Sequence, residues 1–316
     1  MMKIVVLDAA TLGEDLDLSE LALLGEAVIY KKTEPEEVAE RLADCDVVIL
    51  NKVKLWEDNL KAAGNLKLIC VAATGFDNID TAYCRSRGIT VCNVAGYSTD
   101  SVAQVTVATV LELTTHIREY NKSVTDGEYT RSGVQNRLVP VYHEIAGKTW
   151  GVVGCGNIGR KVCEIASAFG CNVIVNKRTP IENYQCVSLE ALCKTADIIT
   201  VHTPLNDSTR GLIGKEELEL MKADVVLVNE ARGAVLDEKA VCEAVKKGVI
   251  GAFGCDVYSV EPLPENHPYQ EIKHLPNVCL TPHMAWGAYE ARRRCLSEII
   301  KNIKAFFEGN SRNVVN

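Results

Sequence analysis

The sequence predicts an α/β protein made of two doubly wound parallel-sheet domains, and three observations support this prediction. Short apolar runs alternate with segments of helical spacing along most of the chain. The runs are continuous rather than alternating, which is typical of strands buried on both faces and therefore of parallel sheets with helical crossovers. The same rhythm restarts after Trp150, and 316 residues are enough for two cores.

The expected elements follow from these patterns. Strands of the first unit are predicted at residues 4–7, 27–30, 47–50, 68–72 and 89–93, with a helix at 36–43 that begins just after Pro35. Strands of the second unit are predicted at residues 149–153, 172–175, 198–202, 225–229, 251–256 and 278–280.

Three further segments lie outside this regular pattern. A long apolar helix is predicted over residues 100–117, after the capping pair Ser98 and Thr99. The polar stretch 121–147 that follows is expected to be rich in loops and has few core-forming residues. The last predicted helix, 289–308, has no strand partner of its own, so packing against the first unit would make that unit discontinuous.

Composition argues against several classes of protein. A formal net charge of -8 disfavours nucleic-acid binding, and the longest basic run, Arg292-Arg293-Arg294, is interpreted as a solvated helix face or an ion-pairing site. No apolar run approaches the roughly 20 residues that span a bilayer, so no membrane association is expected. The thirteen cysteines are scattered without a C-x-x-C pair, which disfavours a metal site. With no export signal, the expected compartment is the cytoplasm, where thiols stay reduced.

A glycine-rich loop joins the first strand of the second unit to a helix. It reads Gly154-Cys155-Gly156-Asn157-Ile158-Gly159, a G-x-G-x-x-G pattern in a complete βαβ context. Such glycines make a tight turn, let the backbone approach a pyrophosphate, and allow close packing of helix on strand. The helix N-terminus adds free N–H groups and partial positive charge. This loop predicts dinucleotide binding, with a bare structural turn as the alternative.

The end of the next strand bears on the choice of dinucleotide. A carboxylate there would bond the adenosine ribose hydroxyls and repel a 2′-phosphate. The chain instead has Asn176, followed by the two cations Lys177 and Arg178. Charge-assisted bonds to a 2′-phosphate favour NADPH over NADH. The alternative is a solvated turn, with NADH held by the rest of the loop.

Three later stretches carry the residues expected to react. Arg232, Glu261 and His283 each lie at or beyond the carboxyl end of a predicted parallel strand, where ligands of open α/β sheets bind. Singly, they could be a surface ion pair, a turn residue and a loop histidine. Together, after a dinucleotide loop, they provide what carbonyl reduction requires.

The chemistry explains this choice of residue types. Hydride addition to a ketone leaves negative charge on oxygen, and histidine can deliver a proton near neutral pH. A carboxylate on the other ring nitrogen fixes the tautomer and favours the imidazolium. A guanidinium can hold the carboxylate of a 2-keto acid at two points and polarise its carbonyl.

These signatures resemble the D-isomer-specific 2-hydroxyacid dehydrogenase family. The glycine loop, HTPLNDSTRGLI at 202–213, and the ARG, EP and TPH motifs occur in the family's order over essentially the whole chain. The resemblance implies Arg232 as substrate anchor, Glu261 as partner of the histidine and His283 as acid/base. It also implies two groups of binding residues. The cofactor is expected to contact Gly154, Gly156, Asn157, Ile158, Gly159, Asn176, Lys177, Arg178, Thr203, Pro204, Thr209, Ala231 and Asp256, the last through the nicotinamide carboxamide. The substrate is expected to contact Ala73, Thr74 and Gly75 as well as Arg232 and His283.

The resemblance implies a domain organisation too. Residues 1–99 and 287–316 would form a flavodoxin-like substrate domain, with a Rossmann dinucleotide-binding domain, 100–286, inserted in it. The long helix and the polar stretch after it would make the contact of a homodimer.

Within the family, NVAGYSTDSVAQ at 93–104 and TPHMAWGAYEAR at 281–292 are similar to the glycerate dehydrogenases, which reduce hydroxypyruvate. The expected reaction is NAD(P)H-dependent reduction of hydroxypyruvate, and glyoxylate, to the D-2-hydroxy acid. D-lactate, phosphoglycerate or a bulkier 2-keto acid remain alternative substrates, and a non-catalytic dinucleotide sensor remains an alternative of another class. Glu230 departs from the small residues common before Ala231-Arg232-Gly233, and the sequence offers no reason for it.

Overall fold

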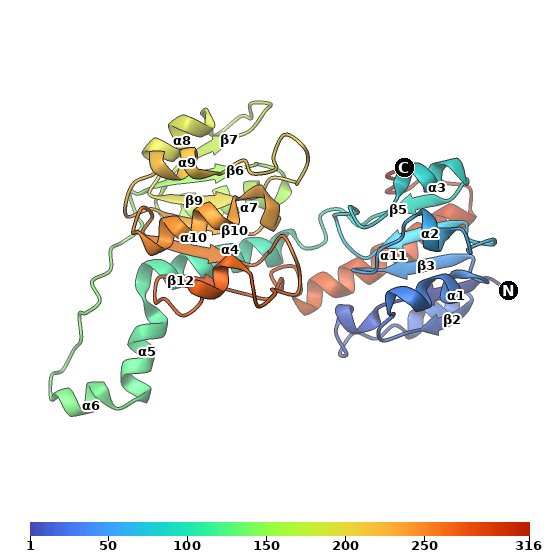
Figure 1. Cartoon of the computed structure of the whole chain (residues 1–316), viewed down its shortest axis with the longest axis horizontal. Helices are drawn as coiled ribbons and strands as arrows, with labels where there is room; N and C mark the ends of the chain where they lie inside the picture. Colours follow the sequence, from blue (N-terminus) through green and yellow to red (C-terminus); the bar gives the residue numbers. More distant parts are fainter. The chain divides into compact units, whose positions relative to one another are not determined.

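The computed structural model describes all 316 residues (Figure 1). Its contacts divide the chain into two compact units. The first unit consists of Met1–Ser98 and Gly287–Asn316, and the second is Thr99–Trp286. Each unit is built around one parallel sheet, which confirms the predicted α/β class.

The first unit holds a five-stranded sheet in the order β2-β1-β3-β4-β5. This order is that of flavodoxin-like sheets. The strands are β1 (Lys3–Val6), β2 (Glu26–Ile29), β3 (Val47–Leu50), β4 (Leu68–Val71) and β5 (Thr90–Cys92). The helices are α1 (Val38–Leu42), α2 (Glu57–Leu60), α3 (Thr81–Ser86) and α11 (Tyr289–Phe307), and α11 packs on β4. Three 3₁₀ turns complete the unit: η1 (Ala9–Leu12), η2 (Ser19–Leu23) and η3 (Pro35–Glu37). β3 and β4 are buried along their whole length, as their continuous apolar sequences predict.

The second unit holds a seven-stranded sheet in the order β12-β11-β10-β9-β6-β7-β8. Counted from β6, this is the Rossmann order 3-2-1-4-5-6 with a seventh strand added. The strands are β6 (Thr149–Val153), β7 (Asn172–Asn176), β8 (Gln185–Cys186), β9 (Ile198–Val201), β10 (Val226–Asn229), β11 (Ala252–Cys255) and β12 (Val278–Leu280). The chain order reverses between β6 and β9, and ligands of such sheets bind beside that point.

Helices cover both faces of the Rossmann sheet. One apolar core lies under α4 (Thr99–Thr115) and α7 (Asn157–Ala168). The other lies under α8 (Leu189–Thr195), α9 (Lys215–Leu220) and α10 (Glu238–Lys246), together with the 3₁₀ turns η4 (Gly233–Val235) and η5 (Pro268–Glu271). The two cores bury the strands from both sides and fix the edge where the strands end.

Some local predictions differ from the structure. The helix predicted over 100–117 ends at Thr115, because His116 takes a left-handed backbone with φ 53° and starts a new helix. The polar stretch after it contains most of α5 (Ile117–Thr125) and all of α6 (Glu128–Ser132). β8 was missed, since two residues carry no readable period.

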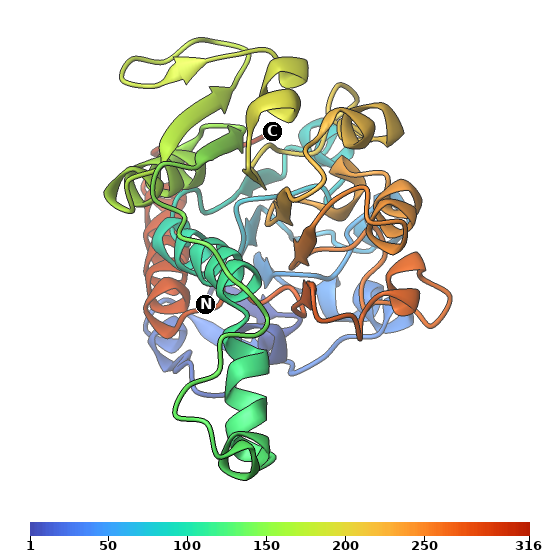
Figure 2. The same cartoon turned by 90° about the vertical axis from the view of Figure 1, so that its left-hand side faces the viewer.

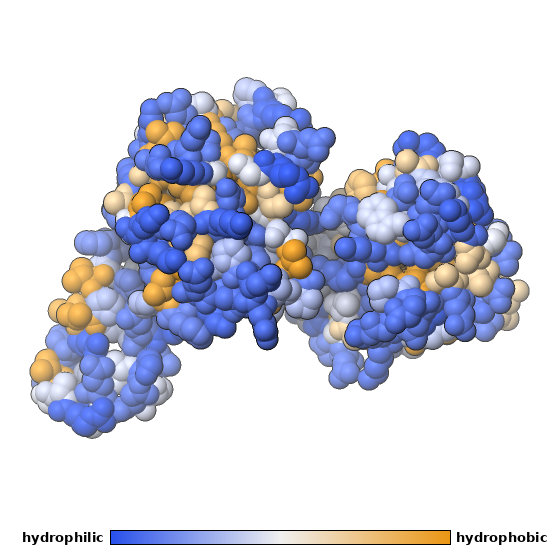
Figure 3. Space-filling model, in the orientation of Figure 1, coloured by the Kyte–Doolittle hydropathy of each residue, from blue (hydrophilic) through white to orange (hydrophobic).

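An arm made of α5, α6 and the segment up to residue 147 extends from the Rossmann sheet (Figures 1 and 2). Figure 3 shows apolar surface on this arm. Its exposed large apolar side chains are Ile117, Val124, Val134, Leu138, Val139, Val141 and Tyr142. Such a concentration is typical of a surface that another protein covers.

All thirteen cysteines are free thiols, and eleven of them are buried. Burial raises the pKa of Cys84 and of Cys92 to about 11. These thiols are small core residues rather than nucleophiles. No helix is long and apolar enough to cross a bilayer, and no three side chains of the metal-ligating types cluster at one point.

Candidate active site

The glycine loop turns from β6 into α7. Gly154 has φ +86°, and a Cβ there would lie 2.7 Å from the Thr203 backbone nitrogen. A Cβ on Gly159 would lie 2.2 Å from the Gly154 carbonyl oxygen. Gly156 differs, because a Cβ there would meet no atom within 4 Å. The outer two glycines therefore permit close packing within the protein, whereas Gly156 leaves open space.

The open space lies at the N-terminus of a twelve-residue helix. Gly156 is the N-cap of α7, and the first turn carries no acidic residue. Free backbone N–H groups and the helix dipole there suit a pyrophosphate. The chain thus fits a dinucleotide at this loop, with Gly156, Asn157 and Ile158 as the residues that would hold it.

At the end of β7 the polar side chains bind nearby backbone. The Asn176 amide donates to the Val187 carbonyl oxygen at 3.1 Å, and the Lys177 ammonium donates to the Cys155 carbonyl oxygen at 3.0 Å. Lys177 therefore ties the strand end to the glycine loop. Arg178 is exposed.

The loop after β9 closes on itself. The Thr209 hydroxyl donates to the Pro204 carbonyl oxygen at 2.6 Å and accepts from the Asn206 N–H at 2.8 Å. At its start, His202 and Thr203 pack their backbone against Gly154. These contacts place Thr203 and Pro204 directly beside the glycine loop.

Arg232 follows β10 in a turn held by Asn229. The Asn229 side chain accepts from the Ala231 N–H at 3.0 Å and donates to the Arg232 carbonyl oxygen at 3.0 Å. Gly233 comes next, and a Cβ on it would lie 2.1 Å from the Tyr258 carbonyl carbon. Only glycine fits such backbone-to-backbone packing, which brings the Arg232 turn against the segment that carries Glu261.

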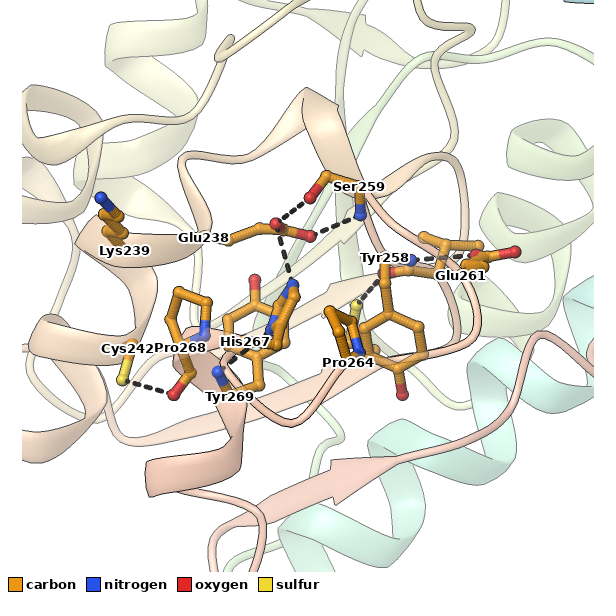
Figure 4. A network of polar contacts seen from close by, with 12 residues as sticks. Glu238, Lys239, Cys242, Tyr258, Ser259, Glu261, Pro264, His267, Pro268 and Tyr269 are labelled. Atoms are coloured by element: carbon orange, nitrogen blue, oxygen red, sulfur yellow. Dashed lines mark hydrogen bonds and ion pairs between the residues drawn. The ribbon is translucent and has the colours of Figure 1, made fainter.

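Glu261 and His283 form a direct pair. The Glu261 Oε2 lies 2.7 Å from His283 Nδ1, and the Oε1 accepts from the Tyr258 N–H at 3.1 Å (Figure 4 shows the Tyr258 contact). Both side chains are partly exposed, at 21% and 29% for the histidine and the glutamate. An ionised carboxylate on Nδ1 requires that nitrogen to carry a proton, which fixes the tautomer of the ring.

Asp256 fixes the segment that carries the histidine. Its carboxylate accepts from the Thr281 hydroxyl at 2.5 Å, from the Met284 N–H at 2.9 Å and from the Ala285 N–H at 2.8 Å. His283 itself has φ 53°, a left-handed conformation that is uncommon outside glycine. Such backbone persists where surrounding contacts over-determine it, as Asp256 does here. All these contacts of Asp256 hold residues next to His283 and so fix its position.

Strand register places four polar side chains in one line. Val201, Asn229, Cys255 and Leu280 are paired across β9, β10, β11 and β12. One residue further along each strand we define the edge row, which consists of His202, Glu230, Asp256 and Thr281. Parallel register puts these side chains on the same face of the sheet.

Two members of the edge row have buried polar side-chain atoms without hydrogen-bond partners. Neither ring nitrogen of His202 and neither carboxyl oxygen of Glu230 has a hydrogen-bond partner. Burial lowers the pKa of His202 to about 3. Burial, and next the negative charge of Asp256, raise the pKa of Glu230 well above its usual range. His202 is therefore uncharged at neutral pH, and the surroundings of Glu230 favour its protonated form.

The predicted substrate loop lies in the first unit, after β4. The Thr74 hydroxyl donates to the Val94 carbonyl oxygen at 3.0 Å, and the Thr74 carbonyl oxygen accepts from the Asn93 amide at 2.7 Å. These bonds fix the loop. The backbone N–H groups of Thr74 and Gly75 have no acceptor within the chain, so they remain available to a carboxylate.

The site also contains residues that sequence reasoning missed. Tyr258 bonds Glu261, and a second pair, Glu238 and His267, supports the same segment (Figure 4). Gly233 was read as part of a motif, but its role as a contact surface was not recognised. The position of Glu238, one residue after the helix-capping Asp237, gives no signal of a partner 29 residues away.

A dinucleotide cradle followed by a carboxylate-paired imidazole and an arginine turn defines a nicotinamide-dependent oxidoreductase. Residues 107–285 match the family model described as D-isomer specific 2-hydroxyacid dehydrogenase, NAD binding domain. The chain belongs to this family, and it is an NAD(P)-dependent dehydrogenase.

Relatives and solved structures agree over the whole length. The chain is 36% identical to the glycerate dehydrogenase of Methylorubrum extorquens, covering 99% of this chain and 98% of that protein. It is 34% identical to the hydroxypyruvate reductase of Blautia hydrogenotrophica, covering 100% of both. The solved structure of an acyclic imino acid reductase in complex with NADPH and D-Arg superposes with a TM-score of 0.88 at 30% identity, with 100% of both chains covered.

Proposed function

We propose that this protein reduces hydroxypyruvate, and also glyoxylate, to the D-2-hydroxy acid with NAD(P)H. The observation that carries the proposal is the 2.7 Å pair of Glu261 and His283. It gives an imidazole whose Nδ1 is held by a carboxylate, which orients the ring and favours its protonated form. The names of the two whole-length relatives, glycerate dehydrogenase and hydroxypyruvate reductase, support the substrate.

The chain's own groups divide the work of the reaction. The Arg232 guanidinium holds the substrate carboxylate and polarises the neighbouring carbonyl. His283, charged and steadied by Glu261, donates its Nε2 proton to the carbonyl oxygen as negative charge develops there. The reduced nicotinamide, when bound, supplies the hydride. In the oxidative direction His283 takes the proton back from the hydroxyl group.

Cofactor binding is assigned to the second unit. Gly154, Gly156, Asn157, Ile158 and Gly159 would cradle the pyrophosphate. The residues proposed to contact the rest of the molecule are Asn176, Lys177, Arg178, Thr203, Pro204, Thr209, Ala231 and Asp256. We favour NADPH because no carboxylate stands at the end of β7 to repel a 2′-phosphate, and Arg178 is exposed beside it.

The first unit, residues 1–99 with 287–316, is the proposed substrate domain, and residues 100–286 form the dinucleotide-binding domain. In the first unit, Ala73, Thr74 and Gly75 would bond the substrate carboxylate. The two N–H groups without an internal acceptor support this assignment. A three-carbon acid matches a loop built of such small side chains.

We propose a cytoplasmic homodimer. The apolar side chains of the arm support this state, because water would otherwise surround all of them. Sedimentation of the wild-type protein would test the proposal, and a monomer at micromolar concentration would contradict it.

Initial rates test the activity directly. We expect oxidation of NADPH, and more slowly of NADH, with hydroxypyruvate and glyoxylate, and lower rates with pyruvate. His283→Ala should abolish turnover and leave the cofactor dissociation constant within about two-fold, because the histidine acts on the substrate. Cofactor binding without turnover on any 2-keto acid would favour a dinucleotide sensor instead.

A further inference from the structure

The structure contains a second carboxylate–imidazole pair, formed by Glu238 at the start of α10 and His267 (Figure 4). The Glu238 Oε2 and the His267 Nε2 are 3.0 Å apart, with only 11% and 4% of the two side chains exposed. The reaction proposed above uses neither residue. Because this buried pair binds the segment that carries Glu261, it is a candidate for a role in the reaction.

The tautomer of His267 follows from its other contact. Its Nδ1 accepts from the Tyr269 N–H at 3.2 Å, so Nδ1 carries no proton in the neutral ring. The proton is therefore on Nε2, which donates to Glu238. The edge-on contacts of the ring with Tyr258 and Tyr269 further restrict its orientation.

Glu238 also binds the other end of the same segment. Its Oε1 accepts from the Ser259 N–H at 2.8 Å, and its Oε2 accepts from the Ser259 hydroxyl. Ser259 and His267 are eight positions apart in the chain, and one carboxylate holds both. We define the clasp as Glu238, Ser259 and His267.

The segment that the clasp closes carries Glu261. One oxygen of Glu261 accepts from the Tyr258 N–H, and the other meets His283. Tyr258 adjoins Ser259, and its backbone rests on Gly233. The direction in which the Glu261 carboxylate points is thus set by the same backbone that the clasp fixes.

We propose that Glu238 and His267 are positioning residues for acid/base catalysis, which act by holding Glu261 in line with His283. The inference rests on the proposed function. Without the clasp, the 258–267 segment samples other conformations and Glu261 spends less time on Nδ1. The imidazolium then loses part of its support, while the glycine loop and the cofactor site stay intact.

Two substitutions of His267 separate the clasp from general packing. His267→Gln places an amide N–H near the position of Nε2, so it keeps the bond to Glu238. His267→Asn places its amide near Nδ1, so it keeps the acceptor for Tyr269 but not the bond to Glu238. Glu238→Gln removes the charged acceptor. Lys239→Gln, at an exposed neighbouring position, is the matched control.

The measurements are kcat and kcat/KM for hydroxypyruvate reduction against pH, and the dissociation constant of NADPH by fluorescence. We expect Glu238→Gln and His267→Asn to lower kcat about ten-fold and to move the alkaline limb of the kcat/KM profile to lower pH, since the protonated imidazole is less well supported. His267→Gln and Lys239→Gln should stay within about two-fold. NADPH affinity should be unchanged in all four variants.

Equal losses in His267→Gln and His267→Asn, or an unshifted pH profile in Glu238→Gln and His267→Asn, would overturn the inference. The two His267 variants decide the matter even if Glu238→Gln fails to fold. Wild-type turnover separates a failure of this inference from a failure of the proposed function. If the wild type is active but the pH profiles of the variants are not shifted, only the positioning role of the clasp is refuted. A wild-type protein without turnover would end both proposals.

Discussion

Asp256 and Glu230 are neighbours in the edge row, yet the protein treats their carboxyl groups in opposite ways. Both are buried. Asp256 accepts three hydrogen bonds from the segment around His283, whereas Glu230 accepts none. A buried carboxylate is stable where donors surround it, and a buried carboxyl group without donors stays protonated. Position in a sheet therefore does not determine charge; the supply of N–H and O–H groups does.

The largest effect is expected when Asp256, the carboxylate with hydrogen-bond donors, is removed. Asp256→Ala leaves the N–H groups of Met284 and Ala285 without an acceptor and releases His283 from its left-handed backbone. We expect a loss of about 3 kcal/mol in the free energy of unfolding and a fall in kcat of at least 100-fold. Denaturant titration and initial rates measure both. The exposed Asp224→Ala is the control, and a comparable loss there would contradict the comparison.

His202 tests whether an unpartnered member of the row is uncharged. Its folded-state pKa of about 3 lies below the unfolded value of 6.5, so the unfolded chain binds more protons at acid pH. The contribution of His202 to the free energy of unfolding is therefore complete above pH 6.5 and is lost as the pH falls toward the folded-state pKa. From pH 7 to pH 5 this loss is about 2 kcal/mol. In His202→Leu the drop in unfolding free energy over that range should be smaller by this amount, and an unchanged drop would refute the interpretation.

Glu230 should show the opposite slope. The folded-state pKa of Glu230 is raised. Its contribution to the free energy of unfolding is therefore complete below the unfolded value of 4.5 and is lost as the pH rises. Glu230→Gln keeps the shape and cannot ionise. We expect the variant to match the wild type near pH 4 and to exceed its unfolding free energy by an amount that grows as the pH rises toward 8. A pH-independent difference would mean that Glu230 has partners in solution.

The smallest effect on stability is expected for a carboxylate placed near the same edge but outside the core. Asn176→Asp, at the half-buried end of β7, should lower the unfolding free energy by about 1 kcal/mol, because the amide bond to the Val187 carbonyl oxygen is lost. It should weaken NADPH about ten-fold by repelling the 2′-phosphate and leave NADH within two-fold. Fluorescence titration with both cofactors measures this, and equal weakening of both would contradict the proposed preference.

The sequence predicted the features that have a period or a motif. Continuous apolar runs predicted eleven of the twelve strands, because most of these strands are buried on both faces, where polar residues are rare. The two-residue β8 and the polar helices of the arm were missed, because neither buries a patterned face. The left-handed His116 that ends α4 was missed as well, since histidine does not signal such a break.

In the site, too, the sequence predicted the residues that form motifs and missed those that depend on three-dimensional contacts. Arg232, Glu261 and His283 were found because their types and strand-end positions match a reaction. The bonds of Asp256, the burial of Glu230 and the clasp were not, because each depends on which groups meet in three dimensions. Glu238 contacts Ser259 and His267 across more than twenty positions, and no local pattern records that pairing.

The reaction of the eleven buried thiols with a modifying reagent can report local unfolding of the protein. In the native protein a thiol-modifying reagent reaches few of them, and burial also keeps them in the unreactive protonated form. Each labelling event at a buried position therefore marks a moment when that part of the chain has separated from its neighbours. Mass spectrometry of pulse-labelled protein would then resolve which of the two sheets loosens first, without any added probe or engineered residue.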